Sequence, residues 1–368
     1  MKVLVTGGAG FIGTHTVRAL RERGDSVRVL DALTSPVHEP GSRPRFPDGV
    51  EFIHGDVCSA DDWRSALKGM DAVIHLAAYQ DYLTDFSRFF HVNSCGTALC
   101  YELIVRDQLP IRRVVVASSQ AVYGEGAVRC RTHGVLMAER RPINLLERRD
   151  WEVRCPKCGE AAKSVPTPEA TPNPASSYGI SKLAAERAAL LLGETYGIET
   201  VALRYSIVHG EGQSPRNAYS GLLRSVALRL LAGQPPVVFE DGLQLRDFVG
   251  IEDVVAANLI ALDEPRASGF AYNVGGGRAW TVLEVVEAVQ KIGGTALIPE
   301  VSTVYRVGDV RHIVSDISSL QKLGWTPRAS LEQVWRRYWS WLREAHPNHG
   351  TLEAAHAQMA REGVLRRV

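Results

Sequence analysis

The sequence predicts an α/β fold, with a doubly wound parallel sheet and a smaller C-terminal α/β lobe. Apolar runs of strand length alternate with helical patterns from Met1 to Ala117, which is typical of a parallel sheet with helices on both faces. A glycine-rich turn joins the first of these strands to the first helix. With 368 residues, the chain is long enough for two domains.

The individual elements follow from apolar periodicity and from capping residues. Gly24 ends a helix that begins at Phe11, and Ser59 with Asp62 forms a capping pair for a helix through Leu67. We expect strands at 2–6, 26–30, 50–54, 72–77, 113–117 and 200–204, the last completing the sheet, and later helices near 218–232, 252–263, 281–292 and 330–345. We assign residues 1–205 to the sheet domain with an insert at 126–170, residues 206–345 mainly to a lobe for a second ligand, and 346–368 to a tail of helical composition.

The stretch from Val3 to Gly13 has the pattern of a dinucleotide-binding turn. Gly7 allows the tight turn, Gly10 lets the main chain approach a pyrophosphate, and Gly13 lets the helix lie close to the strand. The phosphates would bind free N–H groups at the positive end of the helix. A glycine-rich loop without chemistry is the alternative, but strand, spacing and helix all favour a Rossmann-type nucleotide site.

Two carboxylates follow later strands of this predicted sheet. Asp31 ends the next apolar run about 20 residues on, where a carboxylate binds a ribose diol and disfavours a 2′-phosphate. The predicted cofactor is therefore NAD rather than NADP. Asp56, directly after the third strand, is placed to bind the adenine amino group or simply to form a turn.

A tyrosine and a lysine provide a candidate general base. Tyr178 and Lys182 lie four residues apart in a helical stretch that begins near Ser176, so both side chains share one helix face. The cation and a positive nicotinamide ring would stabilise the phenolate, which could then take a proton from a hydroxyl. Ser119, at another strand end, could hydrogen-bond the same oxygen. A solvated helix face is the alternative, but the nucleotide fingerprint favours catalysis.

Charge and composition exclude several classes of protein. Lys and Arg total 42 against 41 for Asp and Glu, giving a net charge of +1, so no global field attracts nucleic acid or an acidic membrane. The apolar runs are too short to span a bilayer, and Met1 leads directly into the first strand. We therefore expect a cytoplasmic protein. Six scattered cysteines do not indicate a disulfide framework.

Together these motifs resemble the extended short-chain dehydrogenase/reductases, and within them the NAD-dependent nucleotide-sugar epimerases and dehydratases. The resemblance covers roughly Met1 to Ala345 and is interrupted after Gly126. It also depends on the later motifs His75-Leu76-Ala77-Ala78, Asn93 before Gly96-Thr97, Val122-Tyr123-Gly124, Leu203-Arg204-Tyr205, Arg246-Asp247-Phe248, Tyr272-Asn273-Val274-Gly275 and Arg306-Val307-Gly308-Asp309.

The resemblance implies roles for individual residues. Tyr178 would be the catalytic base, Lys182 its electrostatic partner and nicotinamide-ribose ligand, and Ser119 the group that orients the sugar hydroxyl. Arg246 and Arg306 resemble pyrophosphate-binding arginines, with an ordinary ion pair as the alternative. The implied NAD site comprises Gly7, Gly10, Phe11, Ile12, Gly13, Asp31, Asp56, Val57, Leu76, Ala77, Ala78, Asn93, Tyr178 and Lys182. The implied substrate site comprises Ser119, Gln120, Asn217, Arg246 and Arg306.

Two departures from the family pattern narrow the predicted reaction. Dehydratases of this kind carry an acidic pair directly after the catalytic hydroxyl residue, where this chain has Gln120 and Ala121. Elimination is therefore disfavoured, and reversible oxidation at sugar C4 remains. In addition, the family's usual Asn after the Arg-Tyr pair is replaced in Arg204-Tyr205-Ser206-Ile207, which predicts an altered pocket. The alternatives are a nucleotide-sugar reductase or decarboxylase, or a non-catalytic NAD-binding sensor.

The substrate and assembly expected from the resemblance are a nucleotide-diphosphate sugar and a homodimer. The pattern is similar to 4-epimerases of UDP-glucose, UDP-glucuronate or dTDP-rhamnose, and no residue chooses among these UDP- and dTDP-linked sugars. Such proteins dimerise through the helix that bears the catalytic tyrosine and the helix around Asn93. Helix 176–192 contains Leu183, Leu190, Leu191 and Leu192, but the sequence does not separate an interface from a core.

The insert carries two ligand pairs with the spacing of a zinc knuckle. Cys130 and His133 form one pair, and Cys155 and Cys158 form the other, each with two residues between its members. A metal could order a loop that has no evident core. Reduced thiols or an unusual disulfide are the alternatives to a structural zinc site. The insert also leans basic, so it contacts either a carboxylated sugar or only solvent.

Overall fold

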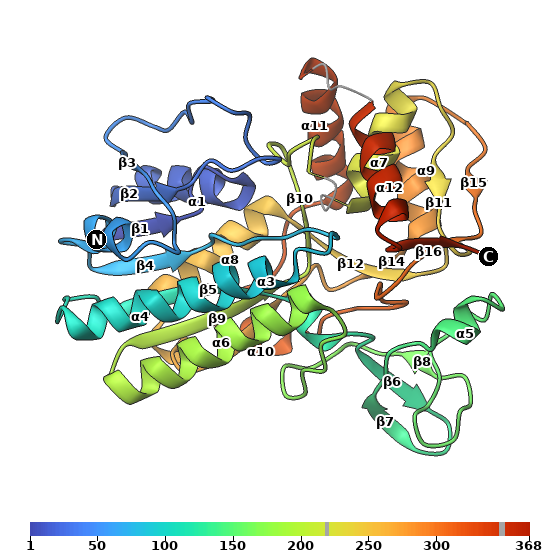
Figure 1. The fold of residues 1–368 in the computed structure, drawn as a ribbon, viewed down its shortest axis with the longest axis horizontal. Coiled ribbons are helices and arrows are strands. Elements are labelled where there is room, and N and C mark those ends of the chain that lie inside the picture. The colour runs from blue at the N-terminus through green and yellow to red at the C-terminus, as the bar shows by residue number, and fades with distance from the viewer. Residues whose placement is uncertain (218–220, 346–349) are drawn as a thin grey trace.

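The computed structural model describes residues 1–217, 221–345 and 350–368, and its centre is a parallel sheet (Figure 1). Seven strands lie in the order β13-β9-β5-β4-β1-β2-β3, and every neighbouring pair is parallel. The strands are β1 (Lys2–Thr6), β2 (Ser26–Asp31), β3 (Glu51–His54), β4 (Ala72–His75), β5 (Arg113–Ser119), β9 (Glu199–Tyr205) and β13 (Ala271–Val274). The α/β doubly wound fold expected from the sequence is confirmed.

Helices cover both faces of this sheet because its strands are apolar on both sides. Val3 and Val5 of β1 face one apolar cluster, and Leu4 between them faces the other, as the alternation of side chains along a strand requires. The first cluster includes α1 (Phe11–Glu22) and α8 (Ile251–Asp263), and the second includes α2 (Ala60–Leu67), α4 (Gly96–Arg106) and α6 (Ser177–Tyr196). Short helical turns, α3 (Phe86–Phe89) and a π-helical segment (Phe90–Cys95), precede α4.

One expectation about the sheet is wrong. The strand predicted at 200–204 does not complete it, because β13 pairs with β9 on the outer side. Helix α8 also comes from beyond residue 205 and packs on the same sheet. The seven-stranded sheet therefore takes a strand and a covering helix from the part of the chain that we assigned mainly to the second lobe.

The C-terminal lobe has its own core beside the carboxyl end of the sheet (Figure 1). Its small sheet comprises β10 (Ile207–His209), β12 (Leu245–Gly250) and β14 (Ala279–Thr281), packed with helices α7 (Gly221–Leu231), α9 (Val282–Gly293) and α11 (Leu331–Glu344). Shorter elements are β11 (Val237–Val238), β15 (Glu300–Val301), β16 (Val304–Arg306) and α10 (Ser318–Gln321). The helices expected here are confirmed within a few residues, except that 218–220 lie outside the described residues.

The tail beyond residue 345 is folded onto this lobe where it is described. Helix α12 (Gly350–Arg361) is followed by β17 (Leu365–Arg367), which pairs antiparallel with β16. Residues 346–349 of the predicted tail lie outside the described part. Within the described ranges, no helix is long and apolar enough to cross a membrane.

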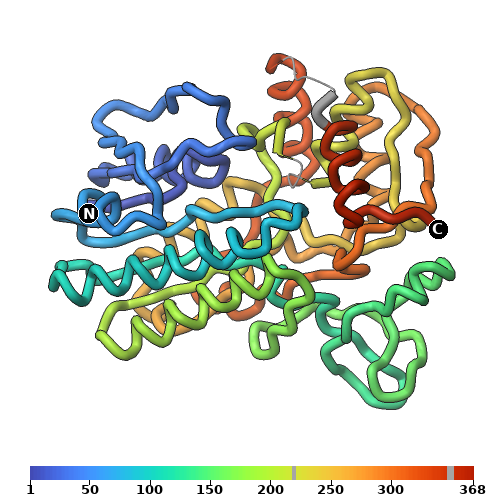
Figure 2. Tube along the Cα trace, in the orientation of Figure 1, coloured from blue at the N-terminus to red at the C-terminus, as the bar shows by residue number. Residues whose placement is uncertain are grey.

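The insert forms a small separate layer of structure that projects from the main body (Figure 2). It contains β6 (Ala127–Cys130), β7 (Gly134–Met137), α5 (Ile143–Leu146) and β8 (Lys163–Ser164). Strand β6 pairs with both β7 and β8. Its own apolar cluster is small and consists of Val128, Cys130, Ala138, Val153, Cys155 and Ala162, with Leu136 against it.

Candidate functional site

A cavity of about 950 Å³ opens at the carboxyl ends of the parallel strands. Its lining includes residues that directly follow β1, β2, β3, β4 and β5, together with residues of the C-terminal lobe. Parallel sheets of this type bind ligands at this edge. The volume is at the upper end of the roughly 300–1,000 Å³ typical of ligand sites, so the cavity has room for more than one small ligand.

The glycine-rich turn forms one end of this cavity with the geometry expected from the sequence. Gly7 has a φ of +66°, and a Cβ there would lie 2.7 Å from the backbone nitrogen of Ala77. A Cβ on Gly13 would lie 2.2 Å from the carbonyl oxygen of Gly7, so a side chain at either position would force the chain apart. Gly10 is much less crowded and lines the cavity at the start of α1.

The two predicted carboxylates also line the cavity, and both have local main-chain partners. Asp31 accepts hydrogen bonds from the backbone N–H groups of Ala9 and Leu33, each at 2.9 Å. Asp56 accepts one from Cys58, also at 2.9 Å. A carboxylate has about four acceptor positions, so these turns fix the side chains and leave acceptor capacity for a ligand.

Most of the remaining predicted cofactor residues line the same cavity, but Asn93 does not. The lining includes Phe11, Ile12, Val57, Leu76, Ala77 and Ala78. Asn93 is 1% exposed and lies behind the cavity wall. Its side chain accepts from the backbone N–H of Tyr79 at 2.8 Å and donates to the carbonyl of Tyr79 and to Ser181, each at 3.0 Å. It therefore holds the loop after β4 against α6.

Helix α6 brings Tyr178 next to Ser119 because of one glycine. A Cβ on Gly179 would lie 2.4 Å from the carbonyl oxygen of Ala121, so only glycine lets α6 lie this close to the segment after β5. Ser176 caps the helix by accepting from the N–H of Gly179 at 3.1 Å. The side chains of Tyr178 and Ser119 are hydrogen-bonded to each other. Tyr178, Ser119 and Lys182 all line the cavity.

Burial determines the electrostatics of Tyr178 and Lys182. Burial raises the pKa of the Tyr178 phenol to about 12, although the hydrogen bond with Ser119 opposes the rise. Burial also lowers the pKa of the Lys182 ammonium to about 8, against the attraction of Glu186. The phenol of Tyr178 is therefore protonated at neutral pH in the protein alone. The expectation that Lys182 and a positive nicotinamide ring together stabilise the phenolate stays a prediction.

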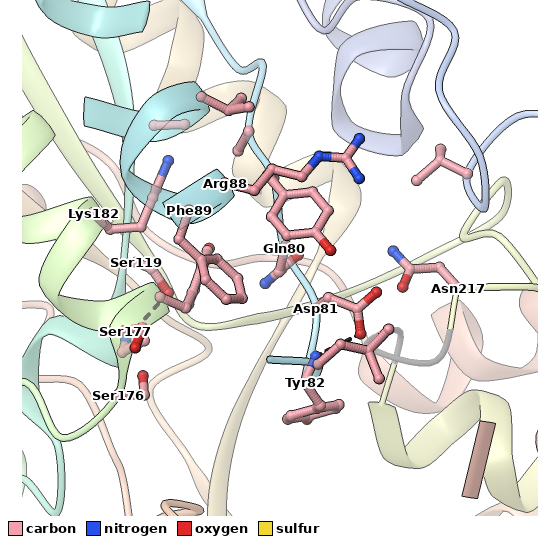
Figure 3. A pocket seen from close by; sticks show the side chains of 18 of the residues that line it. Gln80, Asp81, Tyr82, Arg88, Phe89, Ser119, Ser176, Ser177, Lys182 and Asn217 are labelled. Carbon is pink, nitrogen blue, oxygen red and sulfur yellow. Dashed lines mark hydrogen bonds between the residues drawn. The ribbon is translucent and has the colours of Figure 1, made fainter. Parts of the chain in front are cut away.

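The cavity has a second wall opposite this pair. Figure 3 shows Ser119, Ser177 and Lys182 on one side and Asp81, Tyr82 and Asn217 on the other. Gln120 is 9% exposed and lines the cavity, and among the described residues its Oε1 has no hydrogen-bond partner. Ala121 and Ile207 also line the cavity. The positions at which the resemblance places a dehydratase's acidic pair and the family's usual Asn therefore carry neutral or apolar side chains, and these side chains line the cavity.

Arg246 and Arg306 reach the cavity and share one acidic partner. Arg246 lies 3.5 Å and Arg306 lies 3.4 Å from carboxylate oxygens of Asp309. The guanidinium of Arg306 also stacks on the ring of Tyr82 at 3.7 Å. Burial would raise the pKa of the Asp309 carboxyl, but the nearby arginines hold it below its ordinary value. Asp309 thus holds both guanidinium groups at the cavity wall.

Several cavity residues were not anticipated. The segment after β4, including Tyr79 to Thr84, lines the cavity, as do Arg140 from the insert and Glu362 to Val364 from the tail. Glu362 accepts from both the N–H and the hydroxyl of Thr84 at 3.0 Å. These two residues are far apart in sequence, so no local pattern could have predicted the contact.

The predicted metal ligands come together, but away from the cavity. The ligand atoms of Cys130, His133, Cys155 and Cys158 all lie within 4.8 Å of one another. None of the four lines the cavity. Of the insert, only Arg140 lines the cavity.

Comparison with known proteins assigns a family. The sequence model of the NAD dependent epimerase/dehydratase family matches residues 3–144 and 156–275, with a break inside the insert. A dTDP-L-rhamnose 4-epimerase of Burkholderia thailandensis is 33% identical, over 93% of this chain and 95% of that protein. A UDP-glucose 4-epimerase of Thermotoga maritima, solved with UDP-glucose, is 28% identical, with a TM-score of 0.76 over 94% of this chain and 100% of the other. One from Thermus thermophilus, solved with NAD, is 29% identical, with a TM-score of 0.73 over the same shares.

Proposed function

Because this chain belongs to the NAD dependent epimerase/dehydratase family, we propose that it is an NAD-dependent epimerase that inverts C4 of a nucleotide-diphosphate sugar. One observation carries the proposal. The hydrogen-bonded Tyr178 and Ser119, with Lys182 one helical turn away, line the same cavity as the glycine-rich turn. A base, its partners and a dinucleotide site thus share one enclosed space, as transient oxidation of a sugar requires.

The proposed mechanism gives each of these side chains a task. Tyr178 takes the proton of the sugar 4-hydroxyl, and Ser119 holds that oxygen in line with the phenol. When bound, NAD supplies the hydride acceptor and donor for C4. The buried Lys182 stabilises the phenolate, together with the charge of the oxidised cofactor, and binds the nicotinamide ribose. The 4-keto sugar turns over in the cavity, and Tyr178 returns the proton after C4 has been reduced from its other face.

The same wall argues against a dehydratase. Elimination of water from the sugar needs an additional acid and base beside the hydroxyl residue. Gln120 and Ala121 line the cavity there and provide neither. The Oε1 of Gln120, which has no hydrogen-bond partner among the described residues, is instead an acceptor for a sugar hydroxyl. We therefore propose Gln120 as a substrate-binding residue, with the net reaction an inversion.

We propose that the substrate is a UDP- or dTDP-linked sugar whose diphosphate binds Arg246 and Arg306. Their shared carboxylate, Asp309, orients both guanidinium groups, and a guanidinium group binds phosphate through two hydrogen bonds. The relatives named above act on dTDP-rhamnose or UDP-glucose. Asn217, on the far side of the cavity, is a further proposed contact (Figure 3). Arg140 at the rim makes a carboxylated sugar a candidate as well.

A panel of nucleotide sugars tests this proposal directly. The NAD-loaded protein is incubated with UDP-glucose, UDP-galactose, UDP-glucuronate, dTDP-rhamnose and a GDP-sugar, and the configuration at C4 is read by NMR. We expect one UDP- or dTDP-sugar to equilibrate with its 4-epimer, without net NADH. Failure of every sugar in the panel to change at C4 would contradict the assignment.

The same panel separates the alternatives. A reductase would convert NADH to NAD stoichiometrically, and a decarboxylase would release CO2 from UDP-glucuronate. A non-catalytic NAD-binding sensor would bind the cofactor and leave every sugar unchanged. We favour the epimerase over the sensor because a protein that only binds NAD has no need for Tyr178, Ser119 and Lys182 together. The cytoplasmic location stays a prediction of the sequence.

We also propose a homodimer through the face formed by α3, α4 and α6. Large apolar side chains are exposed on this face: Phe86 of α3 (56%), Phe90 of the π-helical segment before α4 (36%), and Ile180 and Leu191 of α6 (45% and 63%). Leu183 and Leu192 of α6 instead pack inside the chain. Light scattering should give twice the chain mass, and Leu191→Glu with Ile180→Glu should give the monomer. A monomeric wild-type protein at micromolar concentration would contradict the dimer.

A further inference from the structure

We propose that Cys130, His133, Cys155 and Cys158 bind one zinc ion, which orders the insert and thereby holds the diphosphate-binding arginines in place. Cys130 Sγ lies 3.6 Å from His133 Nδ1 and 3.7 Å from Cys158 Sγ, and Cys155 Sγ lies 3.5 Å from His133 Nδ1. A tetrahedral site with Zn–S of about 2.3 Å and Zn–N of about 2.05 Å places two sulfurs about 3.8 Å apart and sulfur about 3.6 Å from nitrogen. The distances therefore match a tetrahedron around a single ion.

The main chain around these ligands has the form of two tight turns. Cys130 ends β6, and His133 lies in the turn to β7, where backbone N–H groups of Thr132 and His133 donate to the Cys130 sulfur. In the second turn, the N–H of Gly159 donates to the carbonyl of Cys155 at 2.8 Å, and the N–H of Glu160 donates to the Cys158 sulfur. Each ligand pair is therefore held in a tight turn by its own main chain.

The insert needs a cross-link of this kind because its apolar core is small. The apolar cluster between its strands consists of a few valine, alanine and leucine side chains, and two of the proposed ligands, Cys130 and Cys155, belong to it. A segment of this size with so little apolar burial depends on a metal, a disulfide or a partner for stability. A histidine nitrogen within 3.6 Å of two of the cysteine sulfurs favours the metal over a disulfide.

The insert is bonded to the lobe that carries the diphosphate site. Arg141 is 5% exposed and bonds Glu125 at 2.9 Å, both oxygens of Glu240 at 3.1 Å, and the carbonyl of Asp309 at 3.1 Å. Glu152 accepts from Arg311 at 2.6 Å. Arg141 and Glu152 both lie between the two ligand pairs in the sequence, so the zinc closes the loop that carries them.

These bonds lead to the proposed substrate site through one residue. The carbonyl of Asp309 accepts from Arg141, and its carboxylate bonds Arg246 and Arg306. Loss of the zinc would free the insert and loosen Asp309, and with it both arginines. This second step depends on the proposed function, whereas the metal site itself does not.

Metal analysis tests the site. Wild-type protein from cells grown with zinc, then dialysed against metal-free buffer, should contain one zinc per chain. Cys158→Ser should lower the zinc content by about tenfold or more. Cys95→Ser is the matched control, since Cys95 and Cys158 are both exposed and free, and Cys95 lies outside the cluster; it should retain the metal. A zinc-free wild type, or equal zinc in the two variants, would overturn the site.

A second measurement needs no variant and covers the case in which Cys158→Ser does not fold. Titration of the wild-type thiols with p-hydroxymercuribenzoate should release the zinc to a chromogenic chelator. Modification of the thiols without release of zinc would overturn the proposal.

The coupling to the substrate site has its own readout. The dissociation constant of UDP, measured by calorimetry, should rise about threefold or more in Cys158→Ser and stay unchanged in Cys95→Ser. Equal UDP affinity in a zinc-free, folded Cys158→Ser would contradict the coupling. Stoichiometric zinc in a protein that epimerises no sugar would sustain the metal site and reject the proposed reaction, so the two failures are distinguishable.

Discussion

Glu186 binds Arg204 through both of its carboxylate oxygens, at 2.5 and 2.8 Å, one helical turn after Lys182. The hydroxyl of Ser118 donates to the same carboxylate at 2.6 Å. Arg204 and Ser118 therefore compensate most of the negative charge of Glu186, and little of that charge is left to stabilise the ammonium of Lys182. Burial dominates the lysine, whose pKa falls to about 8. The chain thus holds the Lys182 ammonium in a place that disfavours its charge.

The first prediction follows from this destabilised cation. The unfolded chain has the ordinary lysine pKa of 10.5, so between pH 8 and 10.5 it binds more protons than the folded protein, and stability rises with pH. Lys182→Met removes this dependence. We expect the NAD-free variant to be more stable than wild type at pH 7 by about 1–3 kcal/mol, with the difference shrinking toward pH 10.

Urea unfolding at pH 7, 8.5 and 10 measures this difference. Lys68→Met is the matched control, because Lys68 is exposed at the end of α2, and its stability should follow wild type at each pH. A Lys182→Met curve parallel to wild type across this range would show that the lysine is not held in a desolvated site.

The second prediction concerns Tyr178→Phe. Loss of the phenol removes the proposed base and should lower kcat by about 10²- to 10⁴-fold, while the bound NAD content stays the same. Tyr101→Phe is the control: that phenol is also buried, but it bonds Thr200 at 2.8 Å and lies outside the cavity. Wild-type turnover in Tyr178→Phe would reject the mechanism.

The sheet was predictable because its determinants are local. The run Val114 to Val116 is apolar on both faces, and the glycines at 7, 10 and 13 have a spacing that a close-packed turn requires. Strand β13 was missed because it lies outside the regular alternation of strands and helices and pairs with β9, a strand far back in the chain.

The site was predictable only where the residues that act together lie in one local sequence motif. The pair Tyr178 and Lys182 follows from helical spacing, but the raised phenol pKa depends on burial by distant segments. Likewise, Asp309 organises Arg246 and Arg306 through contacts between loops, and Glu362 reaches the cavity from the tail. Tertiary contacts of this kind leave no pattern in the local sequence.

The third prediction tests whether the side-chain amide oxygen of Gln120 accepts a hydrogen bond from the sugar. Gln120→Met keeps the size of the side chain but removes its amide. We expect kcat/KM for the sugar substrate to fall about five- to tenfold, which corresponds to the free energy of one hydrogen bond. The affinity for UDP should stay unchanged. Gln333→Met, on the exposed face of α11, is the control. Unchanged kcat/KM in Gln120→Met would place the sugar elsewhere in the cavity.

The fourth prediction concerns cofactor choice. Asp31 lines the cavity at the end of β2, where its charge repels a 2′-phosphate. Asp31→Ser should shift the ratio of NADP to NAD affinity by about tenfold or more toward NADP, measured by titration with each cofactor. Asp48→Ser, at an exposed position, should keep the wild-type ratio. Retained preference for NAD in Asp31→Ser would mean that another group excludes the phosphate.

The last prediction concerns His209, a buried histidine that does not line the cavity. His209 stacks on Phe248 at 4.7 Å and accepts from the indole N–H of Trp335 at 2.9 Å. Burial lowers its pKa from 6.5 to about 3. Below pH 6.5 the unfolded chain therefore binds a proton that the folded one does not, and the folded state loses up to about 1.4 kcal/mol per pH unit from this residue.

His209→Gln keeps a polar acceptor but removes the titration. Between pH 6.5 and 5, urea unfolding should show a loss of stability that is smaller than in wild type by about 1–2 kcal/mol. The exposed His54 provides the control, since His54→Gln should lose stability as wild type does. Identical acid profiles for His209→Gln and wild type would mean that the C-terminal core opens to water and lets His209 charge without unfolding.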